Sequence, residues 1–235
     1  MRLLWLMAAN LLVALTPGAG RAQPAPVVVE LFTSQGCTSC PPADALLTEL
    51  AAKPGVIALA LHVDYWDYLG WPDSFASPAF SARQKAYALA FGKRSIFTPQ
   101  VVVQGREPMI GHDAERIHAR IDAHAREDAP VDLTLEMADD ILSIALAPRR
   151  GPVGPVEVVL VRFTPASEVS IEAGGNAGQE IRYTNVVYGG ATVASWDGRE
   201  PVAFQVEIDG LGEADGAVIV QRGHVGPVMS AALLP

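Results

Sequence analysis

Apolar residues follow two different patterns along this chain, and the change falls near residues 127–130. Before it, short apolar runs alternate with segments in which apolar residues recur every three to four positions. The runs predict buried strands and the periodic segments predict amphipathic helices. We expect strands at 27–32, 56–63, 100–104 and 108–110, and helices at 37–53, at 78–91 and after the capping residue Asp113. This order is typical of an α/β domain.

After residue 130 the apolar positions alternate with polar ones. Segments with this period of two, separated by Gly, Pro, Asn and Asp, indicate half-buried strands of an antiparallel β-sandwich. The alternating segments are 131–137, 141–147, 156–163, 181–188, 202–208 and 217–221.

The first 22 residues have the pattern of a secretory signal peptide. Arg2 precedes an apolar run at 3–15, and small residues precede a cleavage site before Gln23. A run of about 13 residues is shorter than the ~20 that span a bilayer. We therefore expect export, to the periplasm or the exterior of a bacterial cell, and no membrane association after cleavage.

Composition narrows the classes of function. The chain of 235 residues is 50% hydrophobic and 18% charged, which favours packed cores over disorder. Its formal charge of −9 argues against binding to nucleic acid or to an anionic membrane, because both usually need a basic patch. Only two cysteines occur, which excludes a disulfide-rich mini-protein and a four-cysteine zinc finger.

The sharpest chemical signal is the pair Cys37 and Cys40, placed after a predicted strand and turn and at the start of a predicted helix. A helix N-terminus offers unpaired N–H groups and a positive dipole end, and both stabilise a thiolate. The thiolate is the nucleophile of disulfide exchange. We expect Cys37 to be the exposed attacking thiol and Cys40 to be more buried and to resolve the mixed disulfide.

Two other interpretations of the pair stay open. A static structural disulfide is one, although closing so short a loop adds little stability. A metal site is the other, because two thiolates with the imidazole of His62 suit Cu(I) or Zn(II). A histidine at the end of a strand is more often structural.

Two segments together resemble the thioredoxin-like superfamily. Residues 29–32 with 37–41 resemble its active-site motif, and residues 98–105 resemble its loop with a cis-proline before the third core strand. The resemblance implies a cis bond at Pro99 and a Thr98 backbone that contacts an extended substrate. It also suggests Glu30 as the buried acid that helps proton transfer, while an ordinary strand-end carboxylate fits equally well. Gly36 and Thr38-Ser39 depart from the thioredoxin pattern.

The whole mature chain also resembles an exported bacterial family of unknown function, in which a thioredoxin-like domain is paired with a C-terminal β domain. The matching segments are 30–44, 62–71, 97–105, 182–187 and 226–228.

Aromatic residues gather directly after the second predicted strand. Tyr65, Trp66 and Trp71 lie at the sheet edge where we expect the cysteine loop. Such side chains supply large contact areas, so they are candidates for a substrate-binding wall. The alternative is a cap that packs on the second helix.

The sequence therefore predicts a signal peptide (1–22), an α/β thioredoxin-like N-terminal domain (23–128) and a mainly antiparallel β-sandwich domain (129–235). The expected activity is thiol–disulfide exchange through Cys37 and Cys40 with a protein or small-molecule thiol or disulfide. No cofactor and no metal are expected for it. The competing functions are copper or zinc handling through the same cysteines and a non-enzymatic binding module with a structural disulfide.

Overall fold

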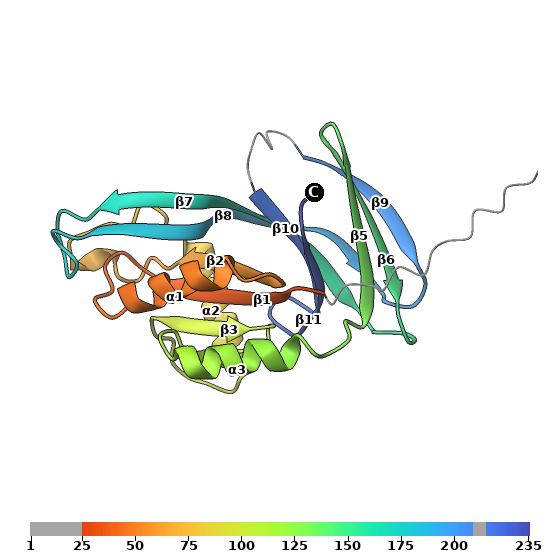
Figure 1. Ribbon diagram of the computed structural model, residues 1–235, viewed down its shortest axis with the longest axis horizontal. Coiled ribbons are helices and arrows are strands. Elements are labelled where there is room, and N and C mark those ends of the chain that lie inside the picture. Colours follow the sequence, from red (N-terminus) through yellow and green to blue (C-terminus); the bar gives the residue numbers. More distant parts are fainter. Residues whose placement is uncertain (1–24, 209–214) are drawn as a thin grey trace, which may run out of the picture.

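The structure is a computed structural model that describes residues 25–208 and 215–235. Within these ranges the chain forms eleven strands, three α-helices and a short 3-10 helix, η1 (Asp67–Leu69). The helices are α1 (Pro41–Ala51), α2 (Pro78–Ala90) and α3 (Ala114–His124). The strands, which Figure 1 shows, are β1 (Val27–Thr33), β2 (Val56–His62), β3 (Gln100–Val103), β4 (Glu107–Ile110), β5 (Val131–Ala138), β6 (Ile141–Pro148), β7 (Val156–Ser170), β8 (Glu180–Trp196), β9 (Val202–Glu207), β10 (Asp215–Gln221) and β11 (Val228–Leu233).

Eight strands form one mixed sheet in the order β11-β10-β7-β8-β2-β1-β3-β4. β1 runs parallel to β2 and antiparallel to β3. β1 is buried along its whole length because helices cover both faces of the sheet there. Leu31 packs in one cluster with Leu47 of α1 and Ile117 of α3, whereas Phe32 packs on the opposite face against Tyr87 of α2.

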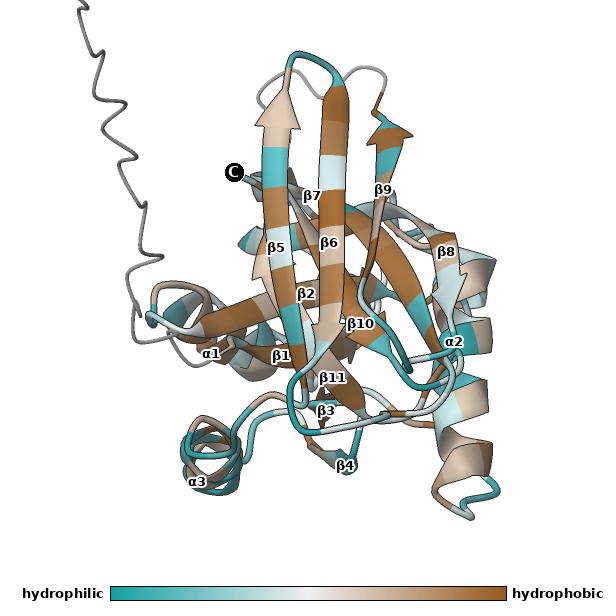
Figure 2. Cartoon of the chain, turned by 90° about the vertical axis from the view of Figure 1, so that its right-hand side faces the viewer, coloured by the Kyte–Doolittle hydropathy of each residue, from teal (hydrophilic) through white to brown (hydrophobic). Residues whose placement is uncertain are grey.

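A second sheet contains three antiparallel strands in the order β5-β6-β9. Its strands alternate between buried and exposed positions, as expected for a sheet with one wet face. Ile144 and Leu146 of β6 join a buried cluster with Val158 of β7 and Val220 of β10. Figure 2 shows this small sheet in front of β7 and β10. The small sheet therefore covers one end of the large one.

The expectation of an α/β thioredoxin-like domain followed by a β-sandwich is wrong. The part of the chain that the structure describes is mostly β, with 43% of its residues in strands and 19% in helices, and strands from both halves share the eight-stranded sheet. The physical reason is the length of β7 and β8, which have 15 and 17 residues. The half of this hairpin near its turn lies beside β2, where Val186 pairs with Ala60, and the other half lies beside β10.

The boundary proposed at residues 128–129 stays a prediction, since nothing in this arrangement tests whether the two parts fold separately. The predicted signal peptide lies outside the described residues. Among the helices that the structure describes, none has both the length and the apolar character required to cross a bilayer.

Candidate functional site

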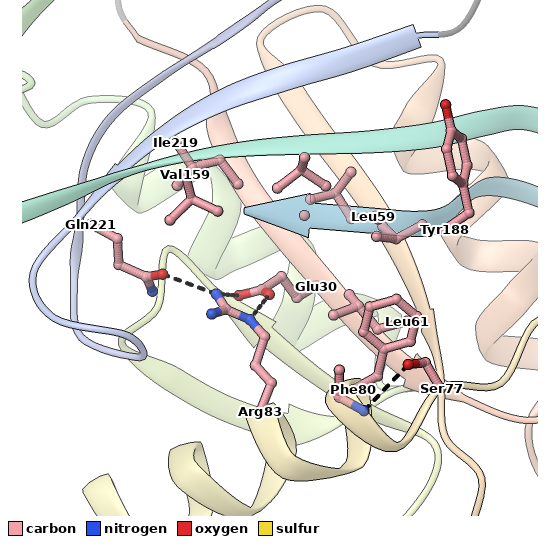
Figure 3. A pocket seen from close by; sticks show the side chains of 15 residues that line it. Glu30, Leu59, Leu61, Ser77, Phe80, Arg83, Val159, Tyr188, Ile219 and Gln221 are labelled. Atoms are coloured by element: carbon pink, nitrogen blue, oxygen red, sulfur yellow. Dashed lines mark hydrogen bonds and ion pairs between the residues drawn. The ribbon is translucent and has the colours of Figure 1, made fainter. Parts of the chain in front are cut away.

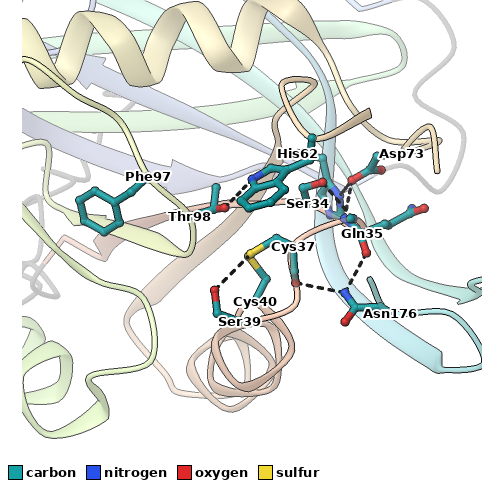
Figure 4. Close-up of a disulfide and its surroundings, with 12 residues drawn as sticks. Ser34, Gln35, Cys37, Ser39, Cys40, His62, Asp73, Phe97, Thr98 and Asn176 are labelled. Atoms are coloured by element: carbon teal, nitrogen blue, oxygen red, sulfur yellow. Dashed lines mark hydrogen bonds and ion pairs between the residues drawn. A yellow bond between two sulfur atoms is a disulfide. The ribbon is translucent and has the colours of Figure 1, made fainter. Parts of the chain in front are cut away.

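A disulfide joins Cys37 and Cys40 where β1 leads into α1 (Figure 4). Cys40 directly precedes the helix, and its carbonyl oxygen accepts hydrogen bonds from the N–H groups of Ala43 (2.8 Å) and Asp44 (3.1 Å). Pro41 begins the helix, in a turn where the missing N–H breaks no helical bond. The cysteine pair therefore lies at the positive end of the α1 dipole.

Both cysteines are sealed from solvent. Cys37 and Cys40 each have 0% of their surface exposed, whereas Thr38 and Ser39 between them are exposed. The prediction that Cys37 is exposed is therefore wrong for the disulfide form that the structure shows. The Ser39 hydroxyl lies 3.5 Å from Cys37 Sγ, which makes Cys37 the sulfur that contacts an exposed side chain.

The turn between β7 and β8, residues 171–179, packs against the cysteine loop. Asn176 of this turn is 2% exposed and donates hydrogen bonds from Nδ2 to the carbonyl oxygens of Gln35 (2.8 Å) and Cys37 (3.0 Å). Gly175 lies so close to the cysteine loop that a Cβ there would be 2.5 Å from Thr38 Cγ2. The far end of the long hairpin therefore lies against the loop that carries Cys37.

Two tryptophans border the site. Trp66 donates from Nε1 to Thr98 Oγ1 (2.8 Å), and a Cβ at Gly36 would lie 3.3 Å from the Trp66 Cβ. Trp71 donates from Nε1 to Gln35 Oε1 (2.8 Å). The structure thus brings both indoles to the loops around the cysteines.

Tyr65, the third aromatic candidate, is directed elsewhere. Its hydroxyl donates to Gln84 Oε1 of α2 (3.1 Å), and its ring packs on the core cluster beneath that helix. This is the packing role that the sequence left open for the aromatic segment.

The loop before β3 lies against the start of α1. The Thr98–Pro99 bond is cis, as the resemblance implied, and Pro99 is buried. A Cβ at Gly111 would be 2.7 Å from Pro99 Cβ and 3.2 Å from Ala43 Cβ, so Pro99 and the first turn of α1 meet at this glycine. Thr98 remains half-buried at the edge of the site.

A carboxyl group that the sequence did not single out lies one helical turn after Cys40. Asp44 is buried, and no hydrogen-bond partner among the described residues reaches either of its side-chain oxygens. Burial raises the pKa of Asp44 to about 7, while the nearby charge of His62 and the hydroxyl of Thr33 oppose the shift. A carboxyl with such a pKa can take up or release a proton near neutral pH.

His62 and Asp73 form a buried pair behind the cysteine loop. His62 Nδ1 lies 2.7 Å from Asp73 Oδ2, and the same oxygen accepts a hydrogen bond from the Gln35 N–H (2.8 Å). The His62 ring contacts the Tyr183 ring edge-on, with centroids 4.8 Å apart. Burial and the carboxylates of Asp44 and Asp73 raise the pKa of the Tyr183 hydroxyl.

Glu30 lies on the opposite face of the sheet from α1. Both of its oxygens accept hydrogen bonds from Arg83 of α2, at 2.6 and 3.1 Å, and the Tyr87 hydroxyl adds a third at 2.6 Å. Glu30 and Arg83 line one corner of an apolar cavity of about 340 Å³ between α2 and the strands β7, β8 and β10 (Figure 3). The structure therefore does not bring Glu30 to the cysteines and gives it the role of a buried ion-pair partner.

The donor set for a metal site is poor. His62 reaches Asp73 with one ring nitrogen, and no group of three or more His, Cys, Asp or Glu side chains in the described residues is arranged to hold a metal ion. The structure gives the copper or zinc alternative no supporting geometry.

Sequence reasoning missed Asp44, Asp73 and Asn176. Asp44 follows the cysteines by one helical turn, a spacing that could have identified it. Asp73 and Asn176 lie in segments assigned to a loop and a turn. Their roles depend on contacts with residues 38 and 139–141 positions away, for which a single sequence carries no signal.

Comparisons with known proteins give a family and related structures. A family model described as "protein of unknown function (DUF1223)" matches residues 28–221. The crystal structure of protein AGR_C_4864 from Agrobacterium tumefaciens is 35% identical and has a TM-score of 0.78, with 91% of this chain and 96% of that chain covered. No curated protein matches the chain.

A more distant similarity concerns the fold alone. HBP35 of Porphyromonas gingivalis is 14% identical and has a TM-score of 0.60, with 89% of this chain and 74% of that chain covered. The expected resemblance to a family of unknown function is confirmed by these findings, whereas a thioredoxin-like fold is not.

Proposed function

The chain belongs to the DUF1223 family of proteins of unknown function, and we propose that it exchanges thiols and disulfides through Cys37 and Cys40. The observation that carries the proposal is the position of the disulfide at the N-terminus of α1. A thiolate formed there gains from the helix dipole and from free N–H groups. A disulfide across so short a loop adds little to the stability of the fold, so a purely structural role explains the cysteine pair less well than disulfide exchange does.

In the proposed reaction the protein disulfide oxidises a partner dithiol. One partner thiolate attacks Cys37 Sγ, the Cys37–Cys40 bond breaks, and Cys40 leaves as a thiolate that takes up a proton. The second partner thiol loses its proton and attacks the mixed disulfide, which expels Cys37. The partner gains a disulfide and loses two protons and two electrons, and the protein gains two thiols. The reverse sequence reduces a partner disulfide.

Asp44 is the group we assign to the proton step at Cys40. It lies in the first turn of α1, and its N–H bonds to the Cys40 carbonyl at 3.1 Å, so both residues occupy the same face of the helix start. A protonated Asp44 can supply the proton that the leaving Cys40 thiolate needs, and it can recover the proton when the disulfide forms again. Glu30, on the other face of the sheet, has no part in this assignment.

We also propose that the reaction takes place outside the cytosol. The predicted signal peptide at residues 1–22 would direct export, and a disulfide between two nearby cysteines persists in an oxidising compartment. The proposed partners are proteins or small molecules that carry thiols or a disulfide.

Trapping a mixed disulfide tests the proposal. Reduced Cys40→Ser protein is mixed with a peptide that contains an internal disulfide, and the products are separated by mass spectrometry. Cys37 should form a covalent adduct that accumulates because no second thiol resolves it. Cys37→Ser is the matched control and should form far less adduct, because Cys37 is the sulfur that lies beside the exposed Ser39 side chain, whereas Cys40 is the leaving sulfur.

The reduction potential of the wild-type pair gives a second measurement. Redox-active pairs have potentials of roughly −270 to −120 mV, and structural disulfides lie below about −300 mV. A value in the first range together with the adduct supports exchange. A value below −300 mV with no adduct in either variant would show that the bridge is structural.

A further inference from the structure

We propose that Asn176 and the turn at residues 171–179 form a gate that controls access of thiols to the Cys37–Cys40 disulfide. The proposal extends the proposed function, because it concerns how the same site is regulated. Asn176 belongs to the hairpin of β7 and β8, and it lies 139 positions from Cys37 in the sequence. Figure 4 shows its side chain directed at the backbone of the cysteine loop.

The hydrogen bonds of Asn176 attach the turn to the cysteine loop. Its amide donates to the carbonyl oxygens of Gln35 and Cys37, and its own oxygen accepts a hydrogen bond from Gln179 Nε2 (3.3 Å). Asn176 is buried, so these bonds are shielded from water, and unpaired buried carbonyls are costly. The closed arrangement is therefore favoured as long as the Asn176 amide is present.

The second part of the gate is steric. Neighbouring glycines bring the turn into contact with its surroundings: Gly175 lies against Thr38, and a Cβ at Gly174 would be 3.1 Å from Trp71 Cβ. The turn therefore sits between the cysteine loop and Trp71. A thiolate must attack a sulfur along the S–S axis, and both cysteines have no exposed surface in the closed form.

With such a gate, the rate at which a partner reacts depends on how extensively it contacts the protein. A small thiol contacts too little of the protein to favour the open form, so it reacts only with the fraction that opens spontaneously. A protein that binds the open site better than the closed one can shift the equilibrium toward opening. We therefore infer that reduction by small thiols is slow in the wild-type protein and that protein partners react faster.

The test is the rate at which dithiothreitol reduces the disulfide in the folded, full-length protein. Asn176→Ala removes both bonds to the cysteine loop, and its rate should rise roughly tenfold, which corresponds to about 1.4 kcal/mol. Glu172→Ala is the matched control, because Glu172 is an exposed residue of the same turn, and it should change the rate less than twofold. Circular dichroism and the unfolding midpoint verify that each variant is folded.

The outcomes separate this inference from the proposed function. An equal rate for wild type and Asn176→Ala, with both folded, would refute the gate whatever the redox activity. A faster rate for Asn176→Ala, without any mixed disulfide in the trapping experiment, would uphold the gate and refute the proposed exchange. If Asn176→Ala does not fold, Asn176→Asp replaces it, since a carboxylate has no N–H to donate and the same acceleration is expected.

Discussion

The carboxyl of Asp44 should make the stability of this protein depend on pH in a direction that is unusual for an aspartate. The perturbation that isolates the effect is Asp44→Asn, which keeps the shape and removes the titration. In the wild-type protein the pKa of the Asp44 carboxyl rises from 3.8 to about 7, because the group is buried without a hydrogen-bond partner among the described residues. The folded state therefore holds the proton over a pH range in which the unfolded chain has released it.

The sign and size of the Asp44 contribution to the free energy of unfolding follow from proton linkage. A raised pKa contributes stability that is fully present below about pH 4 and is lost as the pH rises to about 7. A shift of about three units, at 1.36 kcal/mol per unit, amounts to about 4 kcal/mol. Asp44→Asn cannot lose this contribution. The difference in unfolding free energy between Asp44→Asn and wild type should therefore increase by about 4 kcal/mol, in favour of the variant, as the pH is raised from 4 to 8.

The assay is urea denaturation of the oxidised wild type and variant at several values of pH from 4 to 8. The quantity of interest is the difference in unfolding free energy, because groups that titrate in both proteins cancel. Asp122→Asn is the control: the nearby ammonium of Lys53 lowers the pKa of this exposed carboxyl, so the variant should show no gain at high pH. A difference for Asp44→Asn that stays constant across the pH range would refute the reasoning.

Two further predictions concern other parts of the molecule. Arg83→Met leaves the Glu30 carboxylate, which is 3% exposed, without its cation, so the free energy of unfolding should fall by about 3 kcal/mol in urea denaturation at pH 7. A change below about 0.5 kcal/mol, which is within the usual range for a neutral surface substitution, would show that the ion pair contributes nothing. Gly175→Ala should speed reduction by dithiothreitol several-fold, because the new Cβ would clash with Thr38 Cγ2 at 2.5 Å. Thr38→Ser in the same protein removes that methyl group and should slow reduction again, and an acceleration that survives it would rule out the clash as the cause.

Local sequence patterns were sufficient for most elements. The apolar run at 27–32 became β1 (Val27–Thr33), and the periodic segment at 78–91 became α2 (Pro78–Ala90). Asp113 caps α3 as expected, with its side chain accepting from the Arg116 N–H at 3.3 Å. These features depend on neighbours a few positions apart, which is the range over which period, capping and turn residues act.

The same patterns failed where a strand extends without an apolar signal. The segments 164–170 and 189–196 are rich in small and polar residues, and nothing in them predicted that β7 and β8 would continue. Residues 164–170 pair with 180–186, and residues 189–196 pair with 156–162, so each extension is held in the sheet by the segment of the partner strand that the sequence did predict. The fold class was therefore wrong, although the predicted segments 156–163 and 181–188 do form the first halves of the two strands.

The sequence by itself determined that the two cysteines lie at the start of a helix, because a strand, a turn and a periodic segment follow one another there. Only the tertiary structure decided that Glu30 is directed away from the cysteines, because its carboxylate pairs with Arg83 of α2 on the opposite face of the sheet from α1. It alone also decided that both sulfurs are covered. Asn176 reaches the backbone of the cysteine loop from a hairpin turn 139 positions away in the sequence, and such contacts depend on the packing of the whole chain rather than on any local pattern.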